Sequence, residues 1–216
     1  ALQAATSPTV TQRPPVAGVH YVATMDPAFK RDAFVLCIGH LEDGHFVQDL
    51  VESWRGSRDL PLNPTIVMVH IGGRLKEYGC TSVLSDQYHS ESLQDLAEQH
   101  GIVVEPLPLT GPLKKQMWGE FSLMLGQGKL KLVRHEQQFD ELAKLERTIT
   151  ASGAHQIAGA RDDHAMALAL CLHRALQLGE WKAAVPEKQP VTHAEMFWAA
   201  LKKRSSTKES DIPWYH

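Results

Sequence analysis

The sequence contains few cysteines, only Cys37, Cys80 and Cys171 in 216 residues. Their number is odd, they lie far apart, and two of them sit in apolar runs. They therefore predict reduced core thiols of a cytosolic protein rather than a disulfide framework. No two cysteines have zinc-finger spacing, and His135-Glu136 lacks the second histidine of the metalloprotease helix motif. The sequence thus favours neither disulfides nor a familiar zinc motif.

Other signals are missing as well. No apolar run approaches the roughly 20 residues that cross a bilayer, and no stretch resembles a signal peptide. Neither Ser nor Cys stands in a nucleophile-elbow context, and no Gly-x-x-x-x-Gly-Lys-Ser/Thr occurs. The net charge of -3 gives no global attraction to nucleic acid, so such binding requires a local patch. The chain opens on Ala1 without an initiator Met, which suggests a piece excised from a longer protein.

The composition predicts one domain with tails. With 43% hydrophobic residues, 216 residues suffice for one full core. Residues 1–18 are rich in Thr, Pro, Ala and Gln and predict a linker. The domain would span residues 19–180. Residues 181–216 hold Pro-, Lys- and Ser-containing segments around one amphipathic stretch, which predicts a tail that serves a partner.

The core of the predicted domain is a hairpin. Residues 19–26 and 32–41 are apolar and β-branched, they flank a turn at Pro27, and a third antiparallel strand is predicted over 45–54. Further on, we expect helices over 64–78, 93–100, 113–125, 139–149 and 162–178, strands over 81–86, 102–107 and 129–132, and a loop over 152–161. Three meandering strands followed by strand-helix alternation predict an α/β fold, with a mixed central sheet and helices on both faces.

Acidic residues recur where these elements begin or end. Asp26 ends the first strand, Asp86 ends the fourth, and Asp162-Asp163 opens the last helix. In a mixed α/β sheet such positions converge on one rim, where several carboxylates would repel each other. A divalent cation relieves that repulsion, and all-oxygen ligation suits Mg²⁺ or Mn²⁺. Two such ions would activate water and stabilise the leaving 3′ oxygen of a phosphodiester, with Asp26 bridging both.

Each acid also has a purely structural interpretation. Asp26 before Pro27 would start a turn, Asp86 would cap the next helix, and Asp162 would be an N-cap with Asp163 in the first turn. Helical spacing places Asp162 on the face toward the sheet, which favours Asp162 over Asp163 as the direct ligand.

Three motifs resemble a known family. Met25-Asp26-Pro27-Ala28, Leu84-Ser85-Asp86-Gln87-Tyr88 and the segment from Ala160 to Leu170, Ala-Arg-Asp-Asp-His-Ala-Met-Ala-Leu-Ala-Leu, are similar to the acidic motifs of the nuclease domain of the terminase large subunit. These proteins are the DNA-packaging motors of tailed bacteriophages and herpesviruses. The resemblance covers roughly Val19 to Gly179, and its third motif is the most specific.

The resemblance implies a ribonuclease H-like fold and a metal-dependent endonuclease that cuts concatemeric double-stranded DNA. The implied metal ligands are Asp26, Asp86 and Asp162 or Asp163, for two Mg²⁺ or Mn²⁺ ions. Many relatives have another acid where Met166 stands, so a ligand from that position is not expected. The resemblance further implies an upstream ATPase domain, to which residues 1–18 would be the linker. It also implies a portal, a small terminase subunit and the cytoplasm of an infected host cell. The lack of a long apolar run predicts no membrane.

Histidine and basic residues complete the predicted site. His164 would act in the outer shell of the metal site, or else be an exposed histidine at a helix start. DNA phosphates require cations near the rim, and the alternative for each cation is a solvated surface charge. The candidate phosphate contacts are Lys30, Arg31, Lys114, Lys115, Lys129, Lys131 and Arg161.

Two rival functions remain open at this point. A resolvase, transposase or exonuclease of the same fold would use the same carboxylates on branched or single-stranded DNA. A non-catalytic packaging-complex module would use the acids only as caps and dock its tail on a portal or capsid protein.

Overall fold

A six-stranded mixed sheet organises the chain. The computed structural model describes residues 1–28, 33–57, 59–149, 155–158 and 162–179. The strands of the sheet are β1 (Val22–Asp26), β2 (Ala33–Glu42), β3 (His45–Arg55), β4 (Ser82–Asp86), β5 (Val103–Leu107) and β6 (Leu130–Lys131). Their order is β5-β4-β1-β2-β3-β6. β1, β2 and β3 form the predicted antiparallel meander, whereas β4 pairs parallel to β1, β5 parallel to β4, and β6 parallel to β3.

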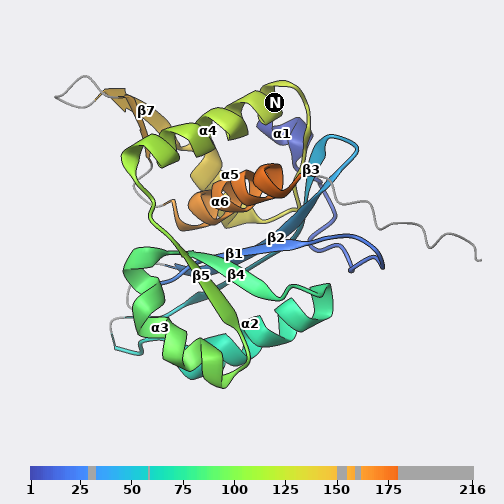
Figure 1. Cartoon of the computed structure of the whole chain (residues 1–216). Coiled ribbons are helices and arrows are strands. Elements are labelled where there is room, and N and C mark those ends of the chain that lie inside the picture. The colour runs from blue at the N-terminus through green and yellow to red at the C-terminus, as the bar shows by residue number, and fades with distance from the viewer. Residues whose placement is uncertain (29–32, 58, 150–154, 159–161, 180–216) are drawn as a thin grey trace, which may run out of the picture. The chain divides into compact units, whose positions relative to one another are not determined.

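Helices cover both faces of this sheet. They are α1 (Leu2–Ala5), α2 (Pro64–Tyr78), α3 (Gln87–Gln99), α4 (Gly111–Gly126), α5 (Glu136–Ala143) and α6 (Asp163–Leu178). Figure 1 shows α2 and α3 on one face and α4, α5 and α6 on the other. Local signals set the ends of α2: the Asn63 side chain accepts a hydrogen bond from the Thr65 N–H, and Gly79 takes the left-handed conformation at φ 68°. Among the described residues, no helix is long and apolar enough to cross a membrane.

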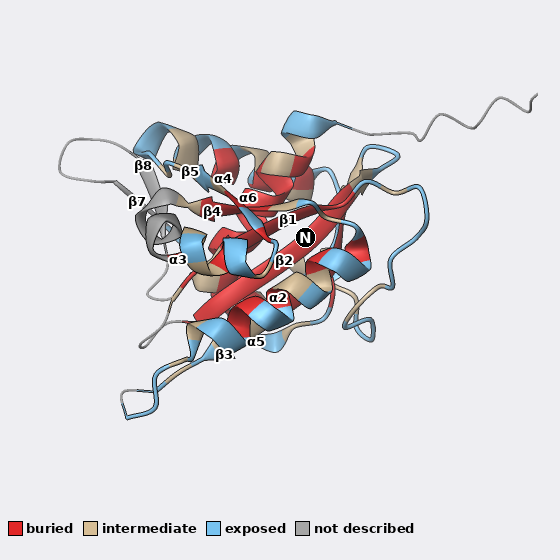
Figure 2. Cartoon of the chain, turned by 60° about the horizontal axis from the view of Figure 1, so that its bottom comes forward, coloured by how far each residue is buried: buried red, intermediate tan, exposed pale blue. Residues whose placement is uncertain are grey.

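Alternation along β2 divides the core into two layers. Phe34, Leu36 and Ile38 pack with α2 and α3, whereas Val35 and Cys37 pack with α4 and α6. All five side chains are fully buried, and Figure 2 shows the central strands buried between the helices. The period of two therefore fixes which residues face each layer of helices. The cysteines are free thiols, as predicted.

The structure differs from the prediction between residues 139 and 161. The predicted helix over 139–149 is wrong beyond Ala143, because α5 ends there and residues 146–149 form strand β7 (Glu146–Ile149). β7 pairs antiparallel with β8 (His155–Ala158), inside the predicted loop. Leu142, Leu145 and Ile149 have helical spacing, but Thr148 and Ile149 are β-branched, and pairing with β8 decides the conformation.

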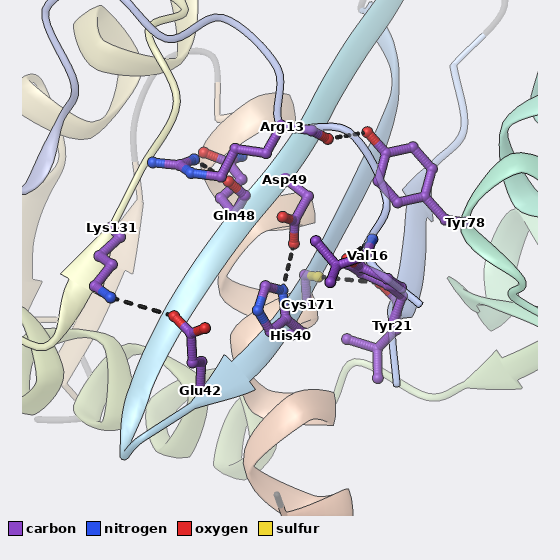
Figure 3. Close-up of polar contacts among 11 residues, drawn as sticks. Arg13, Val16, Tyr21, His40, Glu42, Gln48, Asp49, Tyr78, Lys131 and Cys171 are labelled. Atoms are coloured by element: carbon purple, nitrogen blue, oxygen red, sulfur yellow. Dashed lines mark hydrogen bonds and ion pairs between the residues drawn. The ribbon is translucent and has the colours of Figure 1, made fainter. Parts of the chain in front are cut away.

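The N-terminal segment, predicted as a linker, lies against the sheet. Thr6 forms a bridge with Leu132 next to β6, and the Arg134 N–H donates to the carbonyl of Val10 at 2.6 Å. Arg13 donates from its guanidinium to the Gln48 carbonyl, and the Tyr78 hydroxyl donates to the Arg13 carbonyl at 2.6 Å (Figure 3). These bonds join residues far apart in the sequence, so local composition does not reveal them. The predicted tail over 181–216 lies outside the described residues.

Candidate metal centre at the ends of β1 and β4

Two of the predicted acids end neighbouring parallel strands. Met25 pairs with Ser85 in the register of β1 and β4, so Asp26 and Asp86 follow directly at the same edge of the sheet. Both residues are partly buried. Parallel pairing brings together two carboxylates that are 60 positions apart in the chain, as the strand-end argument predicts.

The third acidic segment begins α6. Asp162 is the N-cap residue, with φ -142° and ψ 20°, and its side chain makes no capping hydrogen bond. The backbone N–H of Ala33 donates to Asp163 Oδ2 at 2.9 Å, which ties the start of α6 to the start of β2. Since β2 pairs with β1, this is the end of the sheet that carries Asp26. Asp162 lies outside the helix, so the helical spacing that favoured it as the direct ligand does not apply.

Asp26 experiences the negative charge of all the other predicted acids. Burial, and after it repulsion from Asp163, Asp162 and Asp86, raises the pKa of Asp26 to about 8. Lys114 lowers the pKa of Asp26 by attraction. Because such charge effects weaken with distance, the three segments face a common region.

Sequence reasoning missed one acidic residue beside this region. Glu141, near the end of α5, is buried and accepts hydrogen bonds from the backbone N–H groups of His164 (2.7 Å) and Ala165 (3.2 Å). Its other oxygen lies 2.8 Å from His164 Nδ1. His164 is fully buried, so the alternative of an exposed helix-start histidine is wrong. No local signal marks Glu141, because it lies 23 residues from His164.

Comparison with known proteins identifies the fold. No protein-family model and no curated protein matches the sequence. The large terminase nuclease from the thermophilic phage G20c superposes with a TM-score of 0.69 at 19% identity, over 80% of this chain and 95% of that chain. This is the fold of the large terminase nucleases.

Two other structures support the same assignment. The large terminase nuclease domain of Thermus phage P74-26 matches with a TM-score of 0.66 at 19% identity, over 84% of this chain and 97% of that one. The HK97 bacteriophage large terminase matches with a TM-score of 0.65 at 12% identity, over 77% of this chain and 41% of that chain. The terminase nuclease fold thus covers most of the chain, and the ribonuclease H-like α/β expectation is confirmed.

The donors at this end of the terminase nuclease fold suit a hard cation in their chemistry. Asp26, Asp86, Asp162 and Asp163 supply four carboxylates, and their mutual repulsion contributes to the raised pKa of Asp26. A divalent cation would neutralise this negative charge. Within the described ranges, however, no group of three or more His, Cys, Asp or Glu side chains is positioned to hold a metal ion. Repulsion between carboxylates extends over longer distances than those at which they share an ion, because each ligand oxygen must lie about 2.1 Å from Mg²⁺. The side chains would have to turn toward one another to share an ion.

The predicted cations fall into separate places. Lys114, in the first turn of α4, acts on Asp26 and is partly buried, whereas the neighbouring Lys115 is exposed. Lys131 pairs with Glu42 at 3.4 Å (Figure 3) and lies beside Val47 near the start of β3. The register places Lys131, and Lys129 just before β6, toward the end of the sheet opposite Asp26. Lys30, Arg31 and Arg161 lie outside the described residues.

Proposed function

We propose that this chain is the metal-dependent endonuclease domain of a viral DNA-packaging terminase and cuts concatemeric double-stranded DNA. The observation that carries the proposal is the convergence of acidic residues at one end of the sheet: the strand register places Asp86 beside Asp26, and Asp163 at the start of α6 accepts a hydrogen bond from Ala33 at the start of β2. The raised pKa of Asp26 is consistent with this convergence. The fold supports the proposal, because the G20c large terminase nuclease has been solved with bound magnesium and with bound cobalt. Perturbed carboxylates gathered in this way are typical of functional sites.

The proposed roles follow from the positions of the side chains. Asp26 lies on β1 between β4 and β2, so it has Asp86 on one side and the start of α6 on the other. Asp26, Asp86 and Asp162 or Asp163 would hold the two ions, and Asp26, which lies between the other acids, would serve both. Bound Mg²⁺ or Mn²⁺ would supply a nucleophilic water and the counter-charge for the leaving 3′ oxygen. His164 would act in the outer shell.

The proposal also implies a setting. The substrate would be double-stranded DNA, held at its phosphates by Lys114 and Lys115, with Lys30, Arg31 and Arg161 as further candidates. An ATPase domain, a portal and a small terminase subunit would complete the packaging motor. Its place of action would be the cytoplasm of the infected host.

Nicking of supercoiled plasmid tests the proposal. With Mg²⁺ or Mn²⁺ at low salt and high protein concentration, we expect conversion to nicked and linear DNA. Chelation with EDTA should lower the rate at least about 100-fold, because loss of the ions removes several kcal/mol of charge stabilisation. Equal cutting in EDTA, or no cutting with either ion, would contradict the proposed function.

Lys114 should contribute to DNA affinity through a phosphate. Lys114→Ala is expected to reduce the slope of log K against log salt concentration by about 1, as the loss of one phosphate contact does. Fluorescence anisotropy of a labelled duplex in EDTA measures this slope without cutting. Lys131→Ala is the matched control, because Lys131 is paired with Glu42. Equal slopes for Lys114→Ala and wild type would remove Lys114 from the DNA contacts.

A further inference from the structure

The start of α6 needs hydrogen-bond acceptors. The first N–H groups of a helix have no partner within the helix, and the N-cap side chain ordinarily accepts from the second or third helical residue. In α6 the N-cap is Asp162, and those two residues are His164 and Ala165. Asp162 has the right residue type and position for this bond, yet its side chain does not make it.

Glu141 makes these bonds from another helix. One of its carboxylate oxygens accepts from both N–H groups, at 2.7 Å from His164 and 3.2 Å from Ala165. The second oxygen lies 2.8 Å from His164 Nδ1. The two donors that Asp162 would satisfy are thus already bonded to a buried side chain of α5. We call this arrangement the Glu141 cap.

Buried neighbours hold the Glu141 cap in place. The His164 ring lies 4.8 Å from the His135 ring, and His135 itself caps α5 by accepting from the Gln138 N–H. Gln138 in turn exchanges hydrogen bonds with Gln48 of β3, at 2.7 and 2.9 Å. Since Glu141, Gln138 and Gln48 are all buried, the cap is fixed to the sheet rather than to a mobile surface.

We propose that Glu141 is a positioning residue for the acidic residues Asp26, Asp86, Asp162 and Asp163 at one end of the sheet. Glu141 caps α6 in place of Asp162 and so keeps the Asp162 carboxylate out of the capping geometry. The charges of Asp162 and Asp163 then both act on Asp26, while the N–H groups of His164 and Ala165 stay bonded to Glu141. The metal-binding part of this inference rests on the proposed function, whereas the exchange of caps does not.

A double-mutant cycle on thermal stability tests the exchange of caps. In EDTA, the change in melting temperature on Asp162→Ala in the wild-type background is the reference, and it includes no loss of a cap, because Glu141 already accepts from those N–H groups. In Glu141→Ala, Asp162 is expected to take over the cap. Asp162→Ala should then lower the melting temperature by about 2–4 °C more than it does in the wild-type background, the usual effect of losing one cap in a domain of this size. Additive effects would overturn the proposal.

Binding of Mn²⁺ separates positioning from stability alone. Glu141→Ala should weaken Mn²⁺ binding about tenfold or more, the usual effect of losing a residue that orients a ligand, measured by the electron paramagnetic resonance signal of free Mn²⁺. Asn63→Ala is the matched control, since it removes the cap of α2 (3.0 Å to the Thr65 N–H) and should not change Mn²⁺ affinity. Glu141→Gln keeps one carbonyl oxygen that can accept from the N–H groups of His164 and Ala165 but loses the charge, so its Mn²⁺ affinity should fall between those of wild type and Glu141→Ala. Glu141→Gln takes the place of Glu141→Ala if the alanine variant does not fold.

The outcomes are distinguishable. Unchanged Mn²⁺ affinity in Glu141→Ala and Glu141→Gln would overturn the positioning role and leave Glu141 a structural cap. A wild-type protein that binds no Mn²⁺ would contradict the proposed function instead, and the melting cycle would then still decide whether Glu141 replaces Asp162.

Discussion

Without metal, Asp26→Asn is expected to melt at a higher temperature than wild type at neutral pH. With metal added, the same variant should no longer cut DNA. Burial and three neighbouring carboxylates keep Asp26 largely protonated in the folded protein at neutral pH, so folding requires uptake of a proton. The amide keeps the shape of the carboxyl group and is neutral without that proton. In the unfolded chain the Asp26 carboxyl is ionised at pH 7, because pH 7 lies about three units above the ordinary pKa of a carboxyl group. The penalty removed is therefore at most about 4 kcal/mol, or roughly 5–15 °C in melting temperature.

The pH dependence has a definite sign. The pKa of Asp26 is about 8 in the folded protein against an ordinary value of 3.8, so the folded state binds the proton more tightly than the unfolded state. Stability of the metal-free protein should consequently fall as the pH rises from about 4 to about 8. Asp26→Asn should flatten this dependence.

Calorimetry without metal, repeated across this pH range, measures both effects. Asp140→Asn is the matched control, because Asp140 is 67% exposed on α5 and its neutralisation should change little. A lower melting temperature for Asp26→Asn than for wild type would contradict the electrostatic description of this end of the sheet.

Asp86→Ala should lower plasmid nicking by at least about 100-fold. The strand register places Asp86 beside Asp26, and loss of one proposed metal ligand removes part of the several kcal/mol that bound ions contribute to the transition state. Rates in Mn²⁺ should be compared at equal protein concentration, with circular dichroism to verify folding.

Asp95→Ala is the control for this variant. Asp95 is exposed on α3, the helix that follows Asp86. Asp95→Ala therefore removes the same charge as Asp86→Ala without changing a residue at the strand ends. Cutting by Asp86→Ala at the wild-type rate would remove Asp86 from the site and leave the fold assignment intact.

Strong local patterns made much of the fold predictable. The β-branched arms of β1 and β2 require a hairpin, and Pro64 and Gly79 mark the ends of α2 in the sequence itself. The strand-end position of Asp26 and Asp86 was likewise readable, because parallel neighbours end at one edge.

Features that depend on distant partners were not predictable in this way. Residues 146–149 match a helical period, and only pairing with 155–158 makes them a strand. Residues 1–18 have the composition of a linker, and this composition does not reveal the bonds that Ala5, Ser7 and Val10 make to Leu132 and Arg134. Glu141 carries no motif at all, and its role depends on packing between α5 and α6.

Anomalous diffraction from crystals soaked in Mn²⁺ tests the central claim most directly. The proposed nuclease predicts peaks between Asp26, Asp86 and the start of α6, with carboxylate oxygens at coordinating distance. No peak at this end of the sheet at high Mn²⁺ concentration would contradict a metal-dependent nuclease. That result would favour a packaging module that binds its partners without cutting DNA.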